Sequence, residues 1–468
     1  MNIRGISAVD TLRKRMTGVS LECLAIVGIF LCGVSGMAKM LPEDGVLASA
    51  LRTPDAADAQ EPEQGSALAS RIALRMGERL KRNGQPVAPQ ARLEQAVLQR
   101  QQLLSSKIAV VFERQGGGIS ESWNATPQAY PLWIRPTFSK TEAVFALDKD
   151  AIRASIHEHF GARLIAPQDV VLEKLEERGE GVIRAHTTGV AKPGEVLDEE
   201  TAASAVMNAL LAGGSGSLTV PIDAVAGKIA NASGQDLGAL TLLATGQSNY
   251  KGSGWGRIQN VKKAFRDHVN NTVVAPGQTY SFNQMLEGPV TTGNGWYMAK
   301  VIENGVDLVD APGGGICQAS TTMFRAMLNA GFVPVERKAH SLYVTFYEEH
   351  GVGIDATIFP GKQDLTFVND TPNYLLVQAY DDGFDAYVHI YGTDDDRTVD
   401  LRGPYFSSTA HMSDVPLDGL NHNEIAWVHT VQYADGREVQ NLVRSRYRAI
   451  PRTLAQKYTL HASAGDAQ

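Results

Sequence analysis

A lone thiol stands at the end of the glycine-rich run "APGGGICQAST", residues 311–321. The 468-residue chain has three cysteines, and two of them, Cys23 and Cys32, lie together in an apolar stretch near the N-terminus. Cys317 is therefore the one cysteine of the expected globular part and has no obvious disulfide partner. Such a thiol is a candidate for chemistry.

The residues around Cys317 favour activation of its sulfur. The pattern "QASTTMFRAMLNAG" predicts a helix that begins at or near Cys317 and ends at Gly331. A cysteine at a helix N-terminus lies at the positive end of the helix dipole, which lowers its pKa. The preceding glycines, 313–315, allow close approach of a backbone to the site. The N–H groups of Cys317 and Gln318, or the Gln318 side chain, are candidate oxyanion donors.

A base and an orienting carboxylate follow in the sequence. His340, in "KAHSLYV", comes 340 − 317 = 23 residues after the cysteine, and Asp355, in "GIDATIF", comes one predicted strand later. We expect His340 on a strand and Asp355 on the neighbouring strand. Nucleophile, base and orienter in this arrangement support nucleophilic catalysis in several unrelated thiol enzymes.

Two other interpretations of Cys317 stay open at this stage. A glycine run before a helix is often only a tight connection, and a buried cysteine behaves as a small hydrophobic residue. Metal binding fits less well, because a catalytic zinc usually takes three protein ligands and one cysteine with one histidine leaves the set incomplete. We therefore expect no metal site and no cofactor.

Six segments in this order resemble the motifs of the VanW family, over about residues 244–392. They are "APGQTYSFNQ", "GWYMAKVIENG", "GGGICQASTTMFRAMLNAG", "ERKAHSLYV", "GIDATIF" and "DLTFVNDTPNYLLVQAY". The family pattern more often has a Gly-Tyr pair where Trp296 separates Gly295 from Tyr297 in this chain. The resemblance makes Cys317 and His340 motif positions and implies a role at the bacterial envelope, with peptidoglycan or its precursors as partner.

Residues near Cys317 and His340 are candidates for substrate binding. We assign this role to seven residues: Gly313, Gly314, Gly315, Gln318, Ser320, Thr321 and Ser341. The segments "FALDKDAIRASI" and "VLDEETAASAVMNALLAGGSGSLTVPIDAV" resemble, more loosely, the peptidoglycan-binding-like domain that commonly precedes VanW domains.

The N-terminus predicts export. Three basic residues at 13–15 precede an apolar segment from about Cys23 to Ala38, which is typical of a cleaved signal or a retained membrane anchor. We expect an exported protein that is anchored to the cell membrane or lies in the extracytoplasmic or periplasmic space. The net charge of -8 argues against broad nucleic-acid binding.

Periodicity predicts an α+β chain. We place a signal or anchor at 1–50, a linker and amphipathic helices at 51–107, and the peptidoglycan-binding-like α+β domain at 108–235. A strand-rich VanW-like domain with one central helix follows at 244–395, and a strand-rich extension at 396–468. Short runs such as "LYVTFYE" and "IDATIF" are predicted as strands.

Three functions remain open from the sequence. In the first, Cys317, His340 and Asp355 carry out acyl transfer on a stem peptide, with hydrolysis or transpeptidation as the outcome. In the second, the same groove binds peptidoglycan without turnover, and Trp296, Tyr297 and Tyr343 provide stacking surfaces. In the third, the protein is an envelope scaffold docked through the helices at 67–107. The sequence does not specify the oligomeric state.

Overall fold

The computed structural model describes residues 62–451 except 115–120, 304, 306 and 408–418. The predicted signal or anchor, with its apolar run at 23–38, lies outside the described residues. Within them, no helix has the length and apolar character needed to cross a membrane. The mixture of helices and mainly antiparallel sheets confirms the predicted α+β class.

The chain divides into two compact units: residues 1–162 with 198–221, and residues 163–197 with 222–468. Parts of the predicted 108–235 domain therefore belong to both units, since β5 (Val170–Arg178) and β6 (Val182–Thr187) join a sheet of the second unit. The assignment of 108–235 as a peptidoglycan-binding-like domain stays a prediction.

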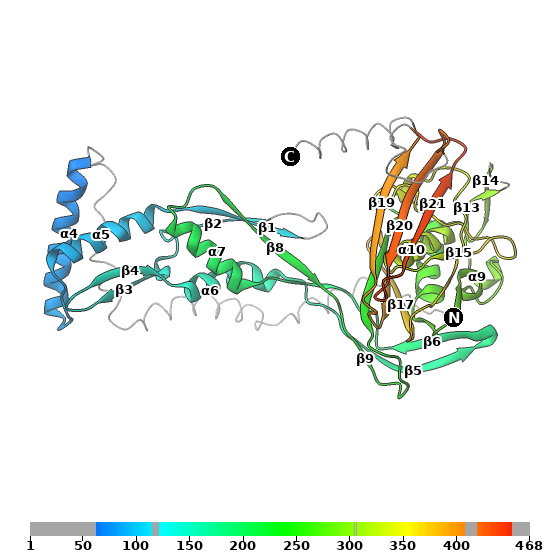
Figure 1. The fold of residues 1–468 in the computed structure, drawn as a ribbon, viewed down its shortest axis with the longest axis horizontal. Helices are drawn as coiled ribbons and strands as arrows, with labels where there is room; N and C mark the ends of the chain where they lie inside the picture. Colours follow the sequence, from blue (N-terminus) through cyan, green and yellow to red (C-terminus); the bar gives the residue numbers. More distant parts are fainter. Residues whose placement is uncertain (1–61, 115–120, 304, 306, 408–418, 452–468) are drawn as a thin grey trace, which may run out of the picture. The chain divides into compact units, whose positions relative to one another are not determined.

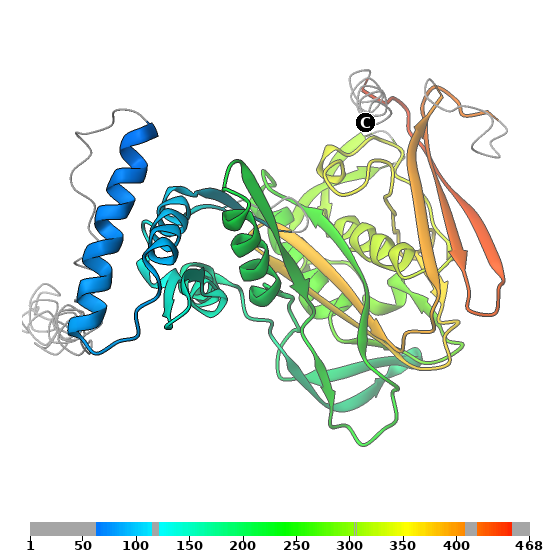
Figure 2. The ribbon, with the colours of Figure 1, turned by 60° about the vertical axis from the view of Figure 1, so that its left-hand side comes forward.

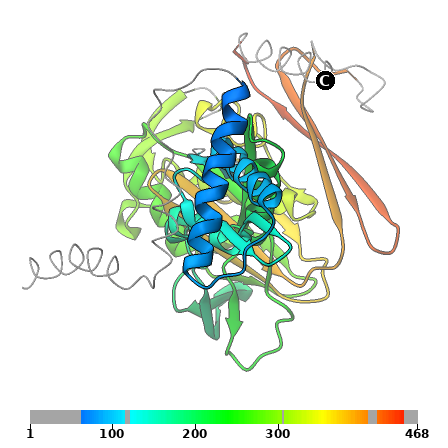
Figure 3. The same cartoon turned by 90° about the vertical axis from the view of Figure 1, so that its left-hand side faces the viewer.

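In the first unit, the predicted amphipathic helices are α4 (Pro62–Arg82) and α5 (Gln90–Ser105), which pack against each other (Figure 2; Figure 3). Their apolar stripes share a core with Phe145 of β4 (Ala143–Leu147), which pairs with β3 (Ile134–Phe138). Because one face of each helix is apolar, the pair is stable only with that face covered.

The rest of the first unit alternates strands and helices as predicted. Helix α6 (Lys149–Phe160) packs on α7 (Glu199–Leu211), and α7 contacts β1 (Ile108–Arg114), which pairs with β2 (Glu121–Ala125). Asp148 and Asp198 cap the two helices, each accepting a hydrogen bond from a first-turn backbone N–H. Strand β8 (Ser217–Val225) also pairs beside β1, and its last residues pair with β7 (Gly194–Val196) in the second unit.

A seven-stranded sheet organises the second unit (Figure 1). Its order is β10-β18-β17-β11-β6-β5-β9, with only β5 and β9 parallel. The strands not yet given are β9 (Ile229–Asn231), β10 (Thr241–Asn249), β11 (Thr272–Val274), β17 (Leu375–Asp382) and β18 (Asp385–Gly392). Strands β17 and β18 are almost wholly buried, so the sheet is covered on both sides at its centre.

Helix α10 (Ile316–Asn329) packs across β10 and β18 and is buried on every side. A Cβ on Gly246 of β10 would lie 2.1 Å from the carbonyl oxygen of Thr322, so glycine permits direct contact between strand and helix. The helix begins one residue before Cys317, and Gly331 follows it with a φ of +79°. This agrees with the predicted central helix and its glycine stop.

Smaller elements surround α10. Helix α8 (Trp255–Lys263) continues as a π-helical turn, Ala264–Val269, and β13 (Met298–Glu303) pairs with β14 (Asp307–Pro312) as the predicted hairpin. Strands β12 (Thr279–Ser281), β16 (Thr366–Val368) and β15 (Pro334–Glu336) form a three-stranded sheet, and Phe282–Met285 form the one-turn α9.

Two predicted strands are wrong. The segment "LYVTFYE" contains a 3₁₀ turn, Thr345–Tyr347, and "IDATIF" makes only isolated bridges, Lys338 with Thr357 and Phe359 with Gln363. The alternation of apolar residues there reflects burial of individual side chains rather than a paired ladder: Ile354, Ala356 and Ile358 join the core that contains α10, whereas Tyr343 contacts Tyr447.

The last strands, β19 (Thr398–Phe406), β20 (Glu424–Gln432) and β21 (Glu438–Arg446), form an antiparallel sheet (Figure 1). A tight turn that contains "DGR", residues 435–437, joins β20 to β21. Buried residues of β20 extend the core beside α10, since Nε2 of His429 donates a hydrogen bond to the carbonyl oxygen of Leu328, near the end of that helix, at 2.9 Å.

Candidate functional site

Cys317 is the second residue of α10, and its thiol is free and half-buried. The preceding turn places Gly315 at the N-cap with a φ of +112°, a conformation that favours glycine. The sulfur lies 3.7 Å from the carbonyl oxygen of Ile358. The thiol thus occupies the start of the buried helix, as the sequence predicts.

The structure brings the three predicted catalytic residues together. His340 hydrogen-bonds Cys317 through its side chain, and its Nδ1 bonds Oδ2 of Asp355. The same carboxylate oxygen accepts the backbone N–H of His340 at 2.9 Å. Because Nδ1 is held by Asp355, Nε2 is the ring nitrogen left for the sulfur. The order is therefore thiol, imidazole, carboxylate.

Two residues that the sequence analysis missed hold Asp355. The hydroxyl of Tyr447 donates to Oδ1 at 2.6 Å, and the Arg337 guanidinium lies 3.4 Å from the same oxygen. Arg337 also donates to the backbone carbonyl of Asp355 at 2.7 Å. Asp355 is 2% exposed, so these contacts compensate for the loss of water around a buried charge.

Electrostatics favour a charged pair at the site. Burial alone would lower the pKa of His340, but the charge of Asp355 and the hydrogen bonds to Asp355 and Cys317 outweigh it and raise the pKa to about 9. Burial likewise opposes ionisation of Cys317, yet the hydrogen bond and charge of His340 outweigh it and lower the pKa of the thiol. Both shifts act in the same direction, toward a thiolate beside an imidazolium.

The buried carboxylate of Asp355 stabilises the charged form of His340. Burial would raise the pKa of Asp355, but the charge and hydrogen bond of His340, together with Arg337 and Tyr447, lower the pKa to about 2. In turn, burial and the neighbouring charge of Asp355 raise the pKa of Tyr447 well above its usual value, so its hydroxyl remains a donor.

His340 and Asp355 lie in loops, which corrects their predicted placement on neighbouring strands. Arg325 of α10 holds the second loop: its buried guanidinium donates to the carbonyl oxygens of Ile354, Tyr347 and Gly351. A buried arginine that donates to several backbone carbonyls fixes an irregular segment that has no strand pairing to hold it. No periodic signal in the sequence could reveal this role.

The glycines before Cys317 contact protein rather than open space. A Cβ on Gly314 would lie 2.7 Å from the carbonyl carbon of Ala299, and one on Gly315 would lie 2.9 Å from Cγ of Arg257. Gly313, with a φ of +83°, faces Val290 in the same way. We expected these glycines to allow close approach of a substrate. In the structure they instead allow the turn to pack between β13 and α8.

Gln318 faces the interior. Its side chain is fully buried, accepts from Arg257 and donates to Ser248 and the carbonyl of Asn249. Its backbone N–H donates to Gly315 at 2.9 Å. Neither group points to an oxyanion in this arrangement, in contrast to the prediction.

The other predicted binding residues differ in exposure. Ser320 and Thr321 are fully buried and bond the backbone of Ala356, so they join α10 to the Asp355 loop rather than facing substrate. Ser341 is half-buried, next to His340. Asn260 of α8, which the sequence analysis missed, donates to the carbonyls of Tyr297 and Gly314 and so fixes the glycine turn.

Of the proposed stacking residues, Trp296 is 3% exposed and stacks on His268, so it belongs to the core. Tyr297 is 44% exposed and packs edge-on against Trp255, which is 64% exposed. Tyr343 is half-buried and contacts the ring of Tyr447. An exposed aromatic pair therefore lies where α8 meets β13.

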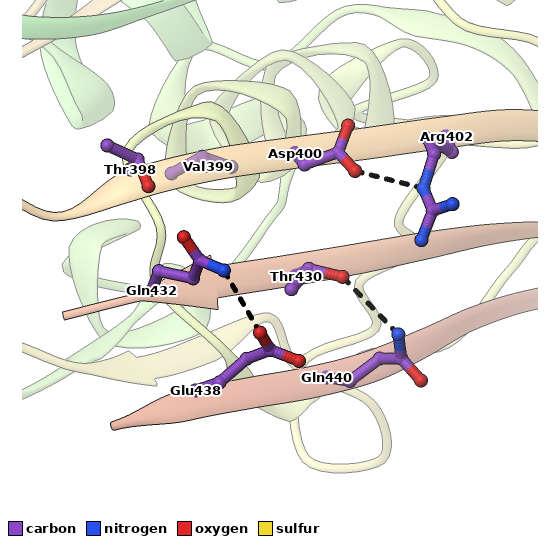
Figure 4. A pocket seen from close by; sticks show the side chains of 8 residues that line it. All are labelled: Thr398, Val399, Asp400, Arg402, Thr430, Gln432, Glu438 and Gln440. Carbon is purple, nitrogen blue, oxygen red and sulfur yellow. Dashed lines mark hydrogen bonds and ion pairs between the residues drawn. The ribbon is translucent and has the colours of Figure 1, made fainter. Parts of the chain in front are cut away.

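A separate depression lies on the outer face of the last sheet (Figure 4). It is lined by Thr398, Val399, Asp400, Arg402, Thr430, Gln432, Glu438 and Gln440. Its polar side chains pair with one another, and it contains none of the three catalytic candidates. Among the described residues, no three His, Cys, Asp or Glu side chains gather in a group that suits a metal ion.

Comparison with known proteins agrees with the motif pattern around Cys317. Residues 256–391 match the family model described as "VanW like protein". The chain carries a VanW-like domain. This domain contains Cys317, His340 and Asp355, whereas Tyr447 lies beyond the matched residues.

Two curated relatives match part of the chain. One is the uncharacterized protein YoaR of Bacillus subtilis (strain 168), 36% identical over 126 residues, which are 27% of this chain and 40% of YoaR. The other is the vancomycin B-type resistance protein VanW of Enterococcus faecalis (strain ATCC 700802 / V583), 30% identical over 135 residues, 27% of this chain and 46% of that protein. The chain thus spans less than half the length of each relative.

A solved structure titled "Structure of the Ldtfm-avibactam carbamoyl enzyme" aligns with 47% of this chain and 75% of its own, at 11% identity and a TM-score of 0.18. Similarity at this level supports no conclusion about the shared fold or chemistry.

Proposed function

We propose that the VanW-like domain is a cysteine-dependent acyl-transfer centre that acts on amide bonds in the stem peptides of peptidoglycan. The observation that carries this proposal is the position of His340, which bonds the Cys317 side chain on one side and the buried carboxylate of Asp355 on the other. A thiolate is the reactive form of cysteine, and this contact favours it.

The expected reaction has two halves. The Cys317 thiolate attacks the carbonyl carbon of the amide and forms a C–S bond, while the His340 imidazolium gives its proton to the leaving nitrogen as the C–N bond breaks. The neutral imidazole then takes a proton from water or from the amine of a second peptide, whose attack on the thioester releases the sulfur as thiolate. Water gives hydrolysis, and an amine gives transpeptidation.

The backbone N–H of Cys317 is the proposed oxyanion donor. The N–H groups of Ile316 and Gln318 on either side of it already donate to the carbonyl oxygens of Gly313 and Gly315 within the turn. A preorganised N–H at the start of a buried helix stabilises negative charge that develops on the substrate oxygen.

The proposed substrate class and the proposed location are supported by different observations. The resemblance of six motifs to the VanW family, and a relative named for vancomycin resistance, favour a cell-wall substrate. The basic residues and apolar run near the N-terminus favour export, with either a cleaved signal or a membrane anchor. We include both in the proposal.

The test is turnover of purified muropeptides by the full chain, followed by mass spectrometry. We expect Cys317→Ala and Cys317→Ser to lose product formation, whereas Glu349→Gln, which removes an exposed carboxylate from the same loop, retains it. A loss of about 10³-fold or more is typical of removing a nucleophile that acts with a base.

Turnover that persists in Cys317→Ala would refute the catalytic proposal. Sacculus binding that survives in Cys317→Ala, with no muropeptide converted by the unmodified chain, would instead indicate a peptidoglycan-binding module. The observation that favours this second function over catalysis is that the side chain and the N–H of Gln318 are engaged in internal hydrogen bonds and do not face an oxyanion.

A further inference from the structure

Arg257 contacts residues that flank the candidate nucleophile, and within the described residues it has no carboxylate partner. Its Nη2 donates to Oε1 of Gln318 at 2.6 Å, and its Nη1 donates to the hydroxyl of Ser253 at 2.6 Å. Both partners are neutral, and no Asp or Glu among the described residues makes an ion pair with Arg257 within 4.0 Å. A half-buried guanidinium whose hydrogen-bond partners are neutral is suited to an anion from outside the chain.

Contacts on both sides of the thiol place Arg257 at the site. Gln318, to which it donates, follows Cys317 directly, and the Cβ position of Gly315, two residues before the thiol, lies 2.9 Å from Cγ of Arg257. Its guanidinium lies over the ring of Phe346, 4.5 Å from the centroid. Tyr347, the next residue, interacts electrostatically with both Arg257 and Cys317.

We propose that Arg257 is a specificity-determining residue that binds the terminal α-carboxylate of the peptide whose amide Cys317 attacks. This inference rests on the proposed acyl-transfer function and adds its substrate class: peptides cleaved next to a free carboxyl end, so that a single terminal amino acid is the leaving group. A carboxylate matches the planar fork of a guanidinium, and it is the anion nearest to the last amide of any peptide.

The position of Arg257 explains why we assign it to the leaving amino acid of the substrate rather than to the acyl part. The acyl part of the substrate becomes bonded to the sulfur, whereas the leaving amino acid carries both the amine that His340 protonates and the carboxylate. An arginine fixed against the residues that flank the thiol orients that amino acid by its charge. Stacking on Phe346 and two hydrogen bonds hold the guanidinium in place before substrate arrives.

The test separates binding from turnover. In the Cys317→Ala background, the affinity of a synthetic stem peptide that ends in D-alanine is measured as the free acid and as the C-terminal carboxamide, by isothermal titration calorimetry. We expect the acid to bind roughly tenfold more tightly or better, as a charged hydrogen bond would allow. Arg257→Gln should abolish this preference.

Arg266→Gln is the matched control, because it removes another positive charge that follows α8 in sequence, from a side chain that is 74% exposed and paired with Asp267. It should leave the preference unchanged. The pH dependence of Cys317 alkylation by iodoacetamide, measured with the thiol present, should be alike in Arg257→Gln and the unmodified chain, which shows that the thiol and imidazole remain in place.

Equal affinity for acid and amide in Cys317→Ala, or a preference that Arg257→Gln keeps, would overturn the inference. An altered alkylation profile in Arg257→Gln, together with weaker binding of both peptides, would also overturn it and assign Arg257 a purely structural role. Loss of muropeptide turnover is a different readout: a chain that binds the acid through Arg257 but converts nothing would refute the proposed catalysis and not this inference.

Discussion

Replacing Asp355 with asparagine should remove the charge that keeps His340 protonated. Asparagine has nearly the same shape, and its single carbonyl oxygen can still accept from the imidazole in the place of Oδ2, while its amide nitrogen replaces the Oδ1 that accepts from Tyr447. The substitution therefore removes the charge and one acceptor with little change in volume. His340 is 5% exposed, and burial alone lowers its pKa. Without the carboxylate, we expect the imidazole to be mostly neutral at pH 7.

The structure sets the size of the effect. The pKa of His340 is raised from 6.5 to about 9, and Asp355 is the largest cause that acts in this direction. At about 1.4 kcal/mol for each pKa unit, the charged form of His340 is favoured by roughly 3 kcal/mol over the ordinary imidazole. In Asp355→Asn, the pKa should fall to the ordinary value or below it.

The assay is an NMR titration of the histidine Cε1–H signals. The His340 signal is identified by its loss in His340→Gln, and its midpoint is followed in the unmodified chain and in Asp355→Asn. Since the imidazolium stabilises the thiolate, the rate of Cys317 alkylation near pH 7 should fall in the same variant.

Asp370→Asn is the matched control, because Asp370 pairs with Arg397 and Tyr433 at the protein surface. Its removal should leave the His340 midpoint near 9. A midpoint that is the same in Asp355→Asn and in the unmodified chain would refute the argument that the buried carboxylate sets the charge of His340, and with it the proposed thiolate–imidazolium pair.

Two further predictions concern stability. The pKa of Asp355 is about 2 when folded and 3.8 ordinarily, so this depressed pKa contributes stability above about pH 4 that is lost as the pH falls through about 2. When urea unfolding is measured as the pH falls from about 4 to about 2, the free energy of unfolding should drop by about 2 kcal/mol more in the unmodified chain than in Asp355→Asn. Equal drops in the two proteins would contradict the assignment. Gly314→Ala should destabilise the protein by about 1–3 kcal/mol through overpacking against Ala299, whereas Gly179→Ala, which has open space around it, should change the free energy of unfolding little.

Local patterns in the sequence predicted the main elements of the site. Periodic apolar residues and the glycine stop at 331 specify α10, and the glycine run specifies the turn before it. Cys317, His340 and Asp355 were found from residue type and order alone. These features are local, because helix periodicity and turn chemistry depend on neighbours within a few residues.

What the thiol and its partners can do was decided by tertiary structure. Tyr447 reaches Asp355 across 92 residues of chain, and Arg325 and Arg337 hold loops that the sequence pattern presented as strands. The same packing buries Gln318 and Trp296, both expected at the binding surface. Charges and hydrogen bonds act through space, and their partners can be far apart in sequence, so no sequence period reveals them. Only the folded arrangement determines which buried polar groups pair with one another.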